Sequence, residues 1–334
     1  MREFLTRCLS RLRTRLGGRR EIRERLAPGF GWFYEAGETL HAGRTKFQEI
    51  EVVRTASFGT TLLLDGATQV MEKSEFQYHE PMAHLALLAH PEPRRVLVIG
   101  GGDGGLVREI LKHRCVEAVD FVELDEEVVA FSRRHLAALG GAAFEDTRVR
   151  LTFMDGRAFV EAAPPASYDV VVMDMTDPAG PALMLYTVEF FRAVARILKD
   201  ERAFFVMHTE SPETRPAAFA RIRRTLAAAF PVVRGAYAYV RMYGTLWSFA
   251  VASPGQDAAE VPPAEIEARI IERGIGPLKL VAGATWAALF SRYPYVEDLL
   301  VGSGEICTDA DPAFPDAFDP RASKRGGRRT GNGG

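Results

Sequence analysis

The chain has 334 residues, of which 47% are hydrophobic and 26% are charged, and its formal net charge is −2 at pH 7. This length allows a large domain and a smaller one, each with its own core, and a charge near zero argues against general nucleic-acid binding, which requires a basic surface. Three widely spaced cysteines predict neither a disulfide framework nor a metal site and fit a reducing cytoplasm, and no apolar run is long enough for integral membrane association.

The two ends of the chain differ from its middle. Residues 1–28 are rich in arginine, and four leucines, at positions 5, 9, 12 and 16, share one helical face. We therefore expect a basic, possibly helical extension that is exposed or packed on a neighbouring subunit, with a membrane-surface helix as the alternative. A secretory signal is not expected, because no uninterrupted apolar stretch is present. Residues 303–334 end in "RASKRGGRRTGNGG", a composition that predicts a disordered tail.

Residues 29–73 predict a small antiparallel β domain. Short β-rich segments, "GWFYEAGETL", "RTKFQEIEVVRTA", "TTLLLDG" and "ATQVME", are separated by glycines or polar turns. The next segment, "SEFQYHEPMAHLALLAH", has helical periodicity instead. It opens a second predicted domain, residues 74–302.

From Arg94 onward, strands and helices alternate. The expected strands are short apolar runs, namely residues 96–99, 118–122, 150–153, 170–173 and 203–207. Helices are expected near residues 105–113, 126–138, 156–163, 186–198 and 213–229. The last strands, "GAYAYVRMY" and "LWSFAVAS", have no helix between them. The pattern predicts an α/β fold of the methyltransferase-type Rossmann class, a mostly parallel sheet that ends in an antiparallel hairpin.

A glycine-rich loop follows the first strand of this sheet. Gly100–Gly105 match G-x-G-x-x-G, a motif that by itself permits NAD, FAD or S-adenosyl ligands. The glycines allow the backbone to turn sharply and approach a ligand. About twenty residues later, Glu123 ends the second strand, where an acid can accept hydrogen bonds from a ribose diol.

Further acids follow the third and fourth strands. Ligands of open α/β sheets bind at the carboxyl ends of the strands, so we expect five carboxylates at one crevice, those of Asp103, Glu123, Asp155, Asp174 and Asp177. Such a crevice would repel a pyrophosphate and suit a cationic ligand. Helix capping remains an alternative role for these acids, and so does a turn at the Asp177–Pro178 pair.

Four segments, "YHEPMAHLALLAHPEPRRVLVIGGGDGG", "VELDEEVV", "DGRAFV" and "YDVVVMDMTDPAGPA", together resemble the spermidine synthases, or polyamine aminopropyltransferases. The resemblance runs from about Gly31 to Leu300. It implies an enzyme that transfers the aminopropyl group of decarboxylated S-adenosylmethionine, a co-substrate, to an amine and releases 5′-methylthioadenosine. Putrescine is the expected acceptor. The resemblance further implies a cytoplasmic homodimer or homotetramer with no metal and no permanently bound cofactor.

The resemblance also implies roles for single residues. Asp174 would be the catalytic residue, because the acceptor ammonium must lose a proton before its nitrogen can attack. Residues that would bind the donor are Gln48, Asp103, Glu123, Asp155, Gly156 and Pro181. Residues that would bind the amine are Tyr78, His79, Asp103, Asp174, Asp177 and Tyr243. The carboxylate of Asp103 would attract the ammonium of the decarboxylated donor and repel the carboxylate of intact S-adenosylmethionine.

Two departures from the family pattern leave the acceptor open. His208 stands where many spermidine synthases have glutamine, and "RMYGTLWSF" keeps Tyr243 but lacks the usual proline. Agmatine or a longer polyamine, of the spermine or thermospermine type, is therefore an alternative acceptor, and His208 is alternatively a packed or hydrogen-bonded residue without a substrate role. Residues 175–186 have the prolines and glycine of a shaped, mobile gate.

Three other functions are weighed against the transferase. A methyltransferase that uses intact S-adenosylmethionine is disfavoured by the acid at position 103 and by the pair at 174 and 177. A non-catalytic polyamine or nucleoside sensor is disfavoured because each catalytic position of the family pattern is occupied. A dehydrogenase is disfavoured by the terminal hairpin and the acidic crevice.

Overall fold

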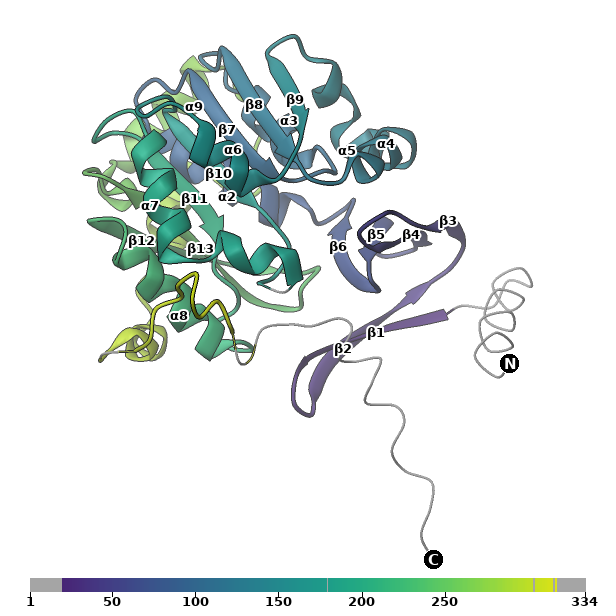
Figure 1. Cartoon of the computed structure of the whole chain (residues 1–334). Helices are drawn as coiled ribbons and strands as arrows, with labels where there is room; N and C mark the ends of the chain where they lie inside the picture. The colour runs from purple at the N-terminus through teal and green to yellow at the C-terminus, as the bar shows by residue number, and fades with distance from the viewer. Residues whose placement is uncertain (1–19, 179, 303, 315, 317–334) are drawn as a thin grey trace, which may run out of the picture. The chain divides into compact units, whose positions relative to one another are not determined.

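The computed structural model describes residues 20–178, 180–302, 304–314 and 316 (Figure 1). The described residues divide into two compact units. The N-terminal unit ends at Ser74, and the C-terminal unit begins at Glu75.

The N-terminal unit consists of antiparallel strands. Strands β1 (Arg20–Ala27) and β2 (Phe30–Ala36) form a two-stranded sheet. A four-stranded sheet has the order β3-β4-β5-β6, with β3 at Thr39–Arg44, β4 at Glu49–Thr55, β5 at Gly59–Leu64 and β6 at Ala67–Met71. The predicted small antiparallel β domain is thus confirmed.

The predicted helical extension is wrong for residues 20–27. These residues pair with β2, with an irregularity at Leu26. Ile22 lies opposite Tyr34, and both side chains are buried. The neighbours of Ile22 in the sequence are charged and more exposed, as expected for a strand with one buried face. Residues 1–19 lie outside the described residues, so a helix there stays a prediction.

The C-terminal unit is built on a seven-stranded sheet with the order β12-β13-β11-β10-β7-β8-β9. Its strands are β7 (Arg95–Gly100), β8 (Ala118–Glu123), β9 (Val149–Phe153), β10 (Val170–Asp174), β11 (Phe204–His208), β12 (Val232–Val240) and β13 (Thr245–Ser253). The first five are mutually parallel, and β13 is antiparallel to both β11 and β12. This arrangement confirms the predicted methyltransferase-type fold.

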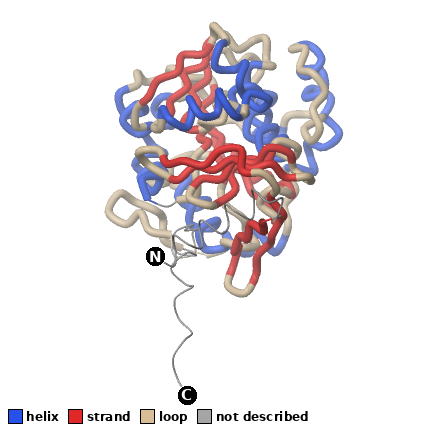
Figure 2. The backbone as a smooth tube through the Cα atoms, turned by 90° about the vertical axis from the view of Figure 1, so that its right-hand side faces the viewer, coloured by secondary structure: helices blue, strands red, loops and turns tan. Residues whose placement is uncertain are grey.

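Helices cover this sheet (Figures 1 and 2). The α-helices are α2 (Phe76–Ala89), α3 (Gly105–Leu111), α4 (Glu126–His135), α5 (Ala137–Gly140), α6 (Gly156–Ala162), α7 (Val188–Ile197), α8 (Pro216–Ala227), α9 (Pro263–Glu272), α10 (Gly283–Leu289) and α11 (Pro294–Glu297). Short 3-10 helices are η1 (Gly141–Glu145), η2 (Gly180–Leu185), η3 (Ala258–Glu260) and η4 (Asp298–Leu300). Within the described ranges, no helix combines the length and the apolar character needed to span a bilayer.

The strand order reverses between β7 and β10, which are neighbours in the sheet. Strands β8 and β9 extend from β7 on one side, and β11 extends from β10 on the other. In open α/β sheets, the loops at the carboxyl ends of such a strand pair separate and leave a crevice for a ligand. Asp103 lies in the loop that follows β7, and Asp174 is the last residue of β10.

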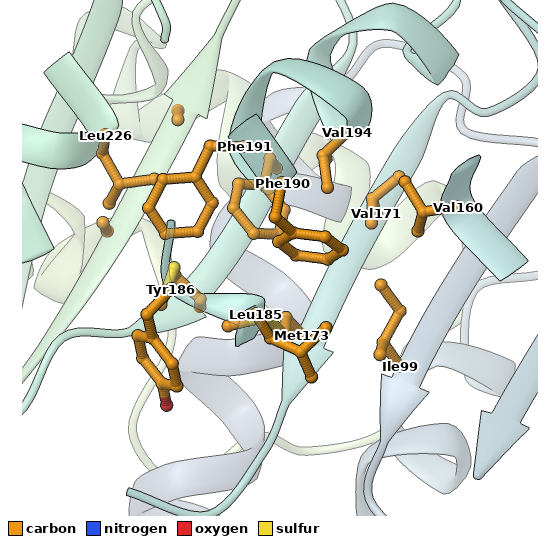
Figure 3. Packing of buried hydrophobic residues seen from close by; sticks show 14 of the residues in the cluster. Ile99, Val160, Val171, Met173, Leu185, Tyr186, Phe190, Phe191, Val194 and Leu226 are labelled. Carbon is orange, nitrogen blue, oxygen red and sulfur yellow. The ribbon is translucent and has the colours of Figure 1, made fainter. Parts of the chain in front are cut away.

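Apolar packing holds the end of β10 in place. Val171 and Met173 of β10 belong to a buried cluster with Phe190, Phe191 and Val194 of α7 (Figure 3). The side chains of a strand alternate between its two faces, and Asp174 is the first polar residue after this run. The core therefore sets the position at which the Asp174 carboxylate leaves the sheet.

Part of the predicted disordered tail is ordered. We use the name C-terminal strap for residues 304–314 and 316. Cys307 of the strap is fully buried, and its carbonyl oxygen accepts a hydrogen bond of 2.9 Å from the Val188 amide. Phe314 is 9% exposed. The disorder prediction is therefore wrong for the strap, because its apolar side chains pack on the core, and residues 317–334 lie outside the described residues.

Candidate active site

The glycine-rich loop between β7 and α3 approaches Asp174 closely. Gly101 has φ +79°, and a Cβ atom there would lie 2.9 Å from Asp174 Oδ2. The Asp103 carboxylate, two residues further on, accepts a hydrogen bond of 2.6 Å from the Gly105 amide through Oδ1. A side chain at position 101 would therefore both strain the backbone and displace the Asp174 carboxylate.

Glu123 and Asp155 are held by backbone amides of their own loops. Glu123 Oε1 accepts hydrogen bonds from the amides of Leu124, at 2.7 Å, and Asp125, at 3.0 Å. Burial nevertheless raises the pKa of Glu123 to about 7. Asp155 is exposed and caps α6, since its Oδ1 accepts a hydrogen bond of 2.9 Å from the Ala158 amide. The capping role that we left open is thus present at Asp155, through one of its two oxygens.

Helix α2 brings two side chains to these acids. The Tyr78 hydroxyl donates a hydrogen bond of 2.8 Å to Asp174 Oδ1. His79 Nδ1 lies 2.6 Å from Glu75 Oε2, and its Nε2 lies 3.8 Å from Asp103 Oδ2. Burial lowers the pKa of His79, but Asp103 and Glu75 outweigh burial and raise that pKa to about 9. His79 is therefore an imidazolium at neutral pH.

The pKa of Asp174 is raised to about 6, because burial and the charge of Asp103 outweigh the stabilising effects of His79 and Tyr78. The carboxyl is still ionised at pH 7 to 8. It is a stronger base than an ordinary aspartate, and the Tyr78 hydroxyl fixes its orientation.

Asp177 pairs with Glu210, a residue that the sequence analysis did not select. Glu210 lies beyond the end of β11, is 1% exposed and has φ +63°. Burial and the neighbouring Asp177 raise the pKa of Glu210 well above its usual range, and burial raises that of Asp177 to about 6. The two carboxyls titrate as a pair, and burial favours the protonated form at Glu210, the more deeply buried of the two.

A signal for Glu210 was present in the sequence. It stands in "VMHTESP", directly after the fifth parallel strand, and the other site acids occupy the same place after their own strands. Ligands of open α/β sheets bind at the carboxyl ends of the strands, and applying this rule to the fifth strand would have selected Glu210.

Aromatic rings cluster next to Tyr78. The Tyr243 ring lies 5.8 Å from the Tyr78 ring, measured between centroids, and 4.4 Å from the Trp247 ring. Trp247 stacks on His208 at 5.6 Å. Such a wall favours a cationic or alkyl group next to the Asp174 carboxylate.

His208 is buried and hydrogen-bonded, and its role toward the substrate stays a prediction. Its Nε2 lies 2.9 Å from the Met175 carbonyl oxygen, which can only accept, so Nε2 carries the proton. Burial lowers the pKa of His208 to about 4, and the ring is neutral. Its Nδ1 is then a bare acceptor, and this buried atom has no hydrogen-bond partner within residues 20–178, 180–302, 304–314 and 316.

Three other residues predicted to bind the donor substrate, Gln48, Gly156 and Pro181, lie on other segments. Gln48 belongs to the N-terminal unit and lies in a turn, where its backbone amide donates a hydrogen bond of 3.1 Å to Thr45 Oγ1. Gly156 begins α6, and a Cβ atom there would lie 2.5 Å from Ile99 Cγ2. Pro181 lies in η2, within the proposed gate segment. Their roles, and the mobility of the gate, stay predictions.

The structure thus brings Tyr78, His79, Asp103 and Asp174 into one network, with Glu123 and the Asp177–Glu210 pair among the neighbouring charges. The network offers a base, an imidazolium and several carboxylates, which suits a cationic substrate. Within the part of the chain that the structure describes, no group of three or more His, Cys, Asp or Glu side chains is arranged to hold a metal ion.

Comparisons with known proteins agree with this geometry. Residues 75–261 match the family model described as spermine/spermidine synthase domain, and residues 20–72 match the spermidine synthase tetramerisation domain. A polyamine aminopropyltransferase of Nitrosomonas europaea is 40% identical over 292 residues, which cover 87% of this chain and 86% of that protein. Polyamine aminopropyltransferase 2 of Hyperthermus butylicus is 40% identical over 275 residues, 82% of this chain and 90% of that protein.

Solved structures show the same fold. A crystal structure of spermidine synthase in complex with the transition-state analogue AdoDATO has a TM-score of 0.78 and 30% sequence identity. Spermidine synthase from Thermotoga maritima has a TM-score of 0.77, also with 30% identity. Each similarity covers 84% of this chain and 94% of the other.

Proposed function

The chain belongs to the spermine/spermidine synthase family of transferases, and from that premise we propose that it transfers the aminopropyl group of decarboxylated S-adenosylmethionine to putrescine. The products are spermidine and 5′-methylthioadenosine. The observation that carries the proposal is the hydrogen-bonded Tyr78–Asp174 pair at the end of β10, surrounded by acids and aromatic rings.

Asp174 acts on the acceptor nitrogen. An alkylammonium has a pKa of roughly 10, so the amine must lose a proton before its lone pair can attack. Asp174, with a pKa near 6, accepts that proton and passes it to solvent. Because about four pKa units separate the two groups, Asp174 supplies only part of the rate, and the in-line placement of nitrogen and carbon supplies another part.

The transfer itself is a displacement at carbon. A nitrogen–carbon bond forms as the bond between that carbon and the sulfonium sulfur breaks. The sulfur leaves with the electron pair as a neutral thioether, 5′-methylthioadenosine. Because the positive charge disperses in this step, an apolar wall such as that of Tyr243 and Trp247 favours it over water.

The donor is bound along the ends of β7, β8 and β9. In the proposal, Asp103 pairs with its terminal ammonium, Glu123 accepts from the ribose hydroxyls, and Asp155 with the Gly156 amide contacts the adenine. Asp103 would repel the carboxylate of intact S-adenosylmethionine, which sets the choice of donor.

The acceptor is bound along the ends of β10 and β11. One nitrogen of putrescine lies at Asp174 and Tyr78, and the other at Asp177, whose charge remains because Glu210 holds the shared proton. Agmatine is the second candidate acceptor. The bare Nδ1 of His208 favours it, because a guanidinium has more N–H donors to satisfy than an ammonium.

The match of residues 20–72 to a tetramerisation domain supports the proposal that copies of the chain assemble through the N-terminal unit. We further propose a cytoplasmic location, because Cys115 and Cys307 are free thiols, as expected in a reducing compartment.

The test is an end-point analysis by mass spectrometry. Purified protein is mixed with decarboxylated S-adenosylmethionine and, separately, putrescine, cadaverine, agmatine, spermidine or no amine. Methylthioadenosine and spermidine, formed in equal amounts with putrescine, are the expected products. Product from agmatine alone would identify the second candidate. Absence of product with every amine would refute the transferase, and intact S-adenosylmethionine would then be tried.

A further inference from the structure

Tyr186 ties together the segment that carries the two acceptor-side acids. It follows η2, is fully buried, and its hydroxyl donates a hydrogen bond of 3.0 Å to the Thr176 carbonyl oxygen. The same hydroxyl lies 3.1 Å from His208 Nε2. Thr176 stands between Asp174 and Asp177, so the phenol holds the backbone that separates the two acids. Figure 3 shows the hydroxyl of Tyr186 directed away from the labelled aliphatic side chains.

The C-terminal strap packs against Tyr186. The ring of Phe314 meets the Tyr186 ring edge to face, with centroids 5.9 Å apart. Arg221 of α8 holds Phe314 from another direction, with its guanidinium 5.7 Å from the centre of the ring. Arg221 also donates to Asp311 Oδ2 and to the Asp311 carbonyl oxygen of the strap. The strap is therefore anchored on α8 while Phe314 contacts Tyr186.

A second set of contacts joins the strap to the residues on either side of Tyr186. Arg157 of α6 donates to both carboxylate oxygens of Asp309, at 2.7 and 2.6 Å, and to the Met184 carbonyl oxygen at 3.2 Å. On the other side, the Val188 amide donates to the Cys307 carbonyl oxygen at 2.9 Å. Met184 and Val188 flank Tyr186 at a distance of two residues, so the strap restrains the chain before and after it.

We propose that the C-terminal strap is a positioning element of the acceptor site, in which Phe314 acts through Tyr186 to hold Thr176 and His208 in place. The inference rests on the proposed function and adds a role for a segment about 140 residues away from the acids in the sequence. Neither Phe314 nor Tyr186 needs to touch substrate. The effect follows because Asp174 and Asp177 depend on the backbone between them, and misplacement by about 1 Å can cost about 100-fold in rate.

The test is a double-mutant cycle with Phe314→Ala and Tyr186→Phe. Phe314→Ala removes the ring contact, and Tyr186→Phe removes only the hydroxyl that bonds Thr176 and His208. We expect each single change to raise the acceptor KM about fivefold or more and to leave the donor KM unchanged. If Phe314 acts through the hydroxyl, the double variant should resemble Tyr186→Phe alone. Calorimetric titration with putrescine should show the same loss of affinity without turnover.

Asp316→Ala is the matched control within the strap. Asp316 accepts hydrogen bonds from the amides of Ala217 and Ala218 at the start of α8, and its loss should lower the melting temperature. It should raise the acceptor KM less than Phe314→Ala does, because the charge of Asp316 affects Glu210 less than burial and Asp177 do. Phe314→Leu keeps an apolar side chain and should restore most of the acceptor affinity. If Phe314→Ala does not fold, Phe314→Leu replaces it in the double-mutant cycle with Tyr186→Phe.

Three results would overturn the inference: equal changes in donor and acceptor KM, fully additive effects in the cycle, or an acceptor KM that responds to Asp316→Ala as strongly as to Phe314→Ala. A wild-type protein that makes no product with any amine would instead refute the proposed function, so the two failures are distinguishable.

Discussion

The two ends of the candidate crevice hold their acids in different ways. On the side of β7, β8 and β9, the carboxylates of Asp103, Glu123 and Asp155 accept hydrogen bonds from amides one to three residues further along the chain. On the side of β10 and β11, Asp174 is bonded to Tyr78, 96 residues away, and Asp177 to Glu210. The first group is positioned by local loops, and the second by contacts between distant elements.

This difference has a functional consequence. The locally held acids form the proposed donor end. The acids held by distant side chains form the proposed acceptor end. Substitutions in several elements can alter that end, so it is where we expect specificity to change among related chains.

The largest expected effect comes from Asp174→Asn. Asparagine keeps the shape of the side chain and can still accept from the Tyr78 hydroxyl, but it cannot take a proton from the amine. We expect kcat to fall by about 100- to 1,000-fold, with methylthioadenosine affinity unchanged. Single-turnover assays with saturating amine would measure the fall in rate, and calorimetry would measure the affinity for methylthioadenosine. A kcat within tenfold of the wild type would remove Asp174 from the role of base.

The Asp177–Glu210 pair should respond asymmetrically. Asp177 carries the charge at neutral pH, so Asp177→Asn should raise the acceptor KM by about 10- to 100-fold. Glu210 already holds the proton, so Glu210→Gln should change that KM by no more than about threefold. Steady-state kinetics at pH 8 with varied putrescine would compare the two variants. Equal effects would show that the proton is not localised on Glu210.

At the donor end, Asp103→Asn should change which donor is accepted. The variant loses an ion pair with the donor ammonium but keeps an oxygen for the Gly105 amide. We expect the KM for decarboxylated S-adenosylmethionine to rise about tenfold and the affinity for intact S-adenosylmethionine to increase, because the repelling charge is gone. Competition between decarboxylated and intact S-adenosylmethionine would measure the ratio of the two affinities. Unchanged selectivity would mean that another residue discriminates between them.

The smallest expected effect is on stability. Burial raises the pKa of Asp174 to about 6, above the value of about 3.9 in an unfolded chain. The folded state therefore binds the proton more tightly, and ionisation of Asp174 lowers stability as the pH rises from 4 to 6. Asp174→Asn should be more stable than the wild type at pH 8 and equally stable below pH 4. Thermal unfolding across this range would measure the difference, and a destabilised variant at pH 8 would contradict it.

Periodicity and strand-end rules were sufficient for the locally determined features. The run "RVLVIG" followed by glycines places Asp103, and the runs before Glu123, Asp155 and Asp174 place those acids at strand ends, because a buried parallel strand must be apolar until it leaves the sheet. The family resemblance added the reaction. Residues 20–27 were misassigned because their pattern of arginines and spaced apolar residues fits either a helix or a strand. Only the pairing with β2 distinguishes the two.

Only the tertiary structure decided how distant residues combine. Glu210 becomes the buried partner of Asp177, His208 takes the Nε2–H form because Met175 offers only a carbonyl, and Phe314 of a segment expected to be disordered reaches Tyr186. Protonation states and packing depend on neighbours that no local pattern specifies. The sequence by itself therefore determined the sheet, its strand-end acids and the residues of the proposed donor end, whereas the proposed acceptor end depends on contacts between β10, β11, β13, α2 and the C-terminal strap.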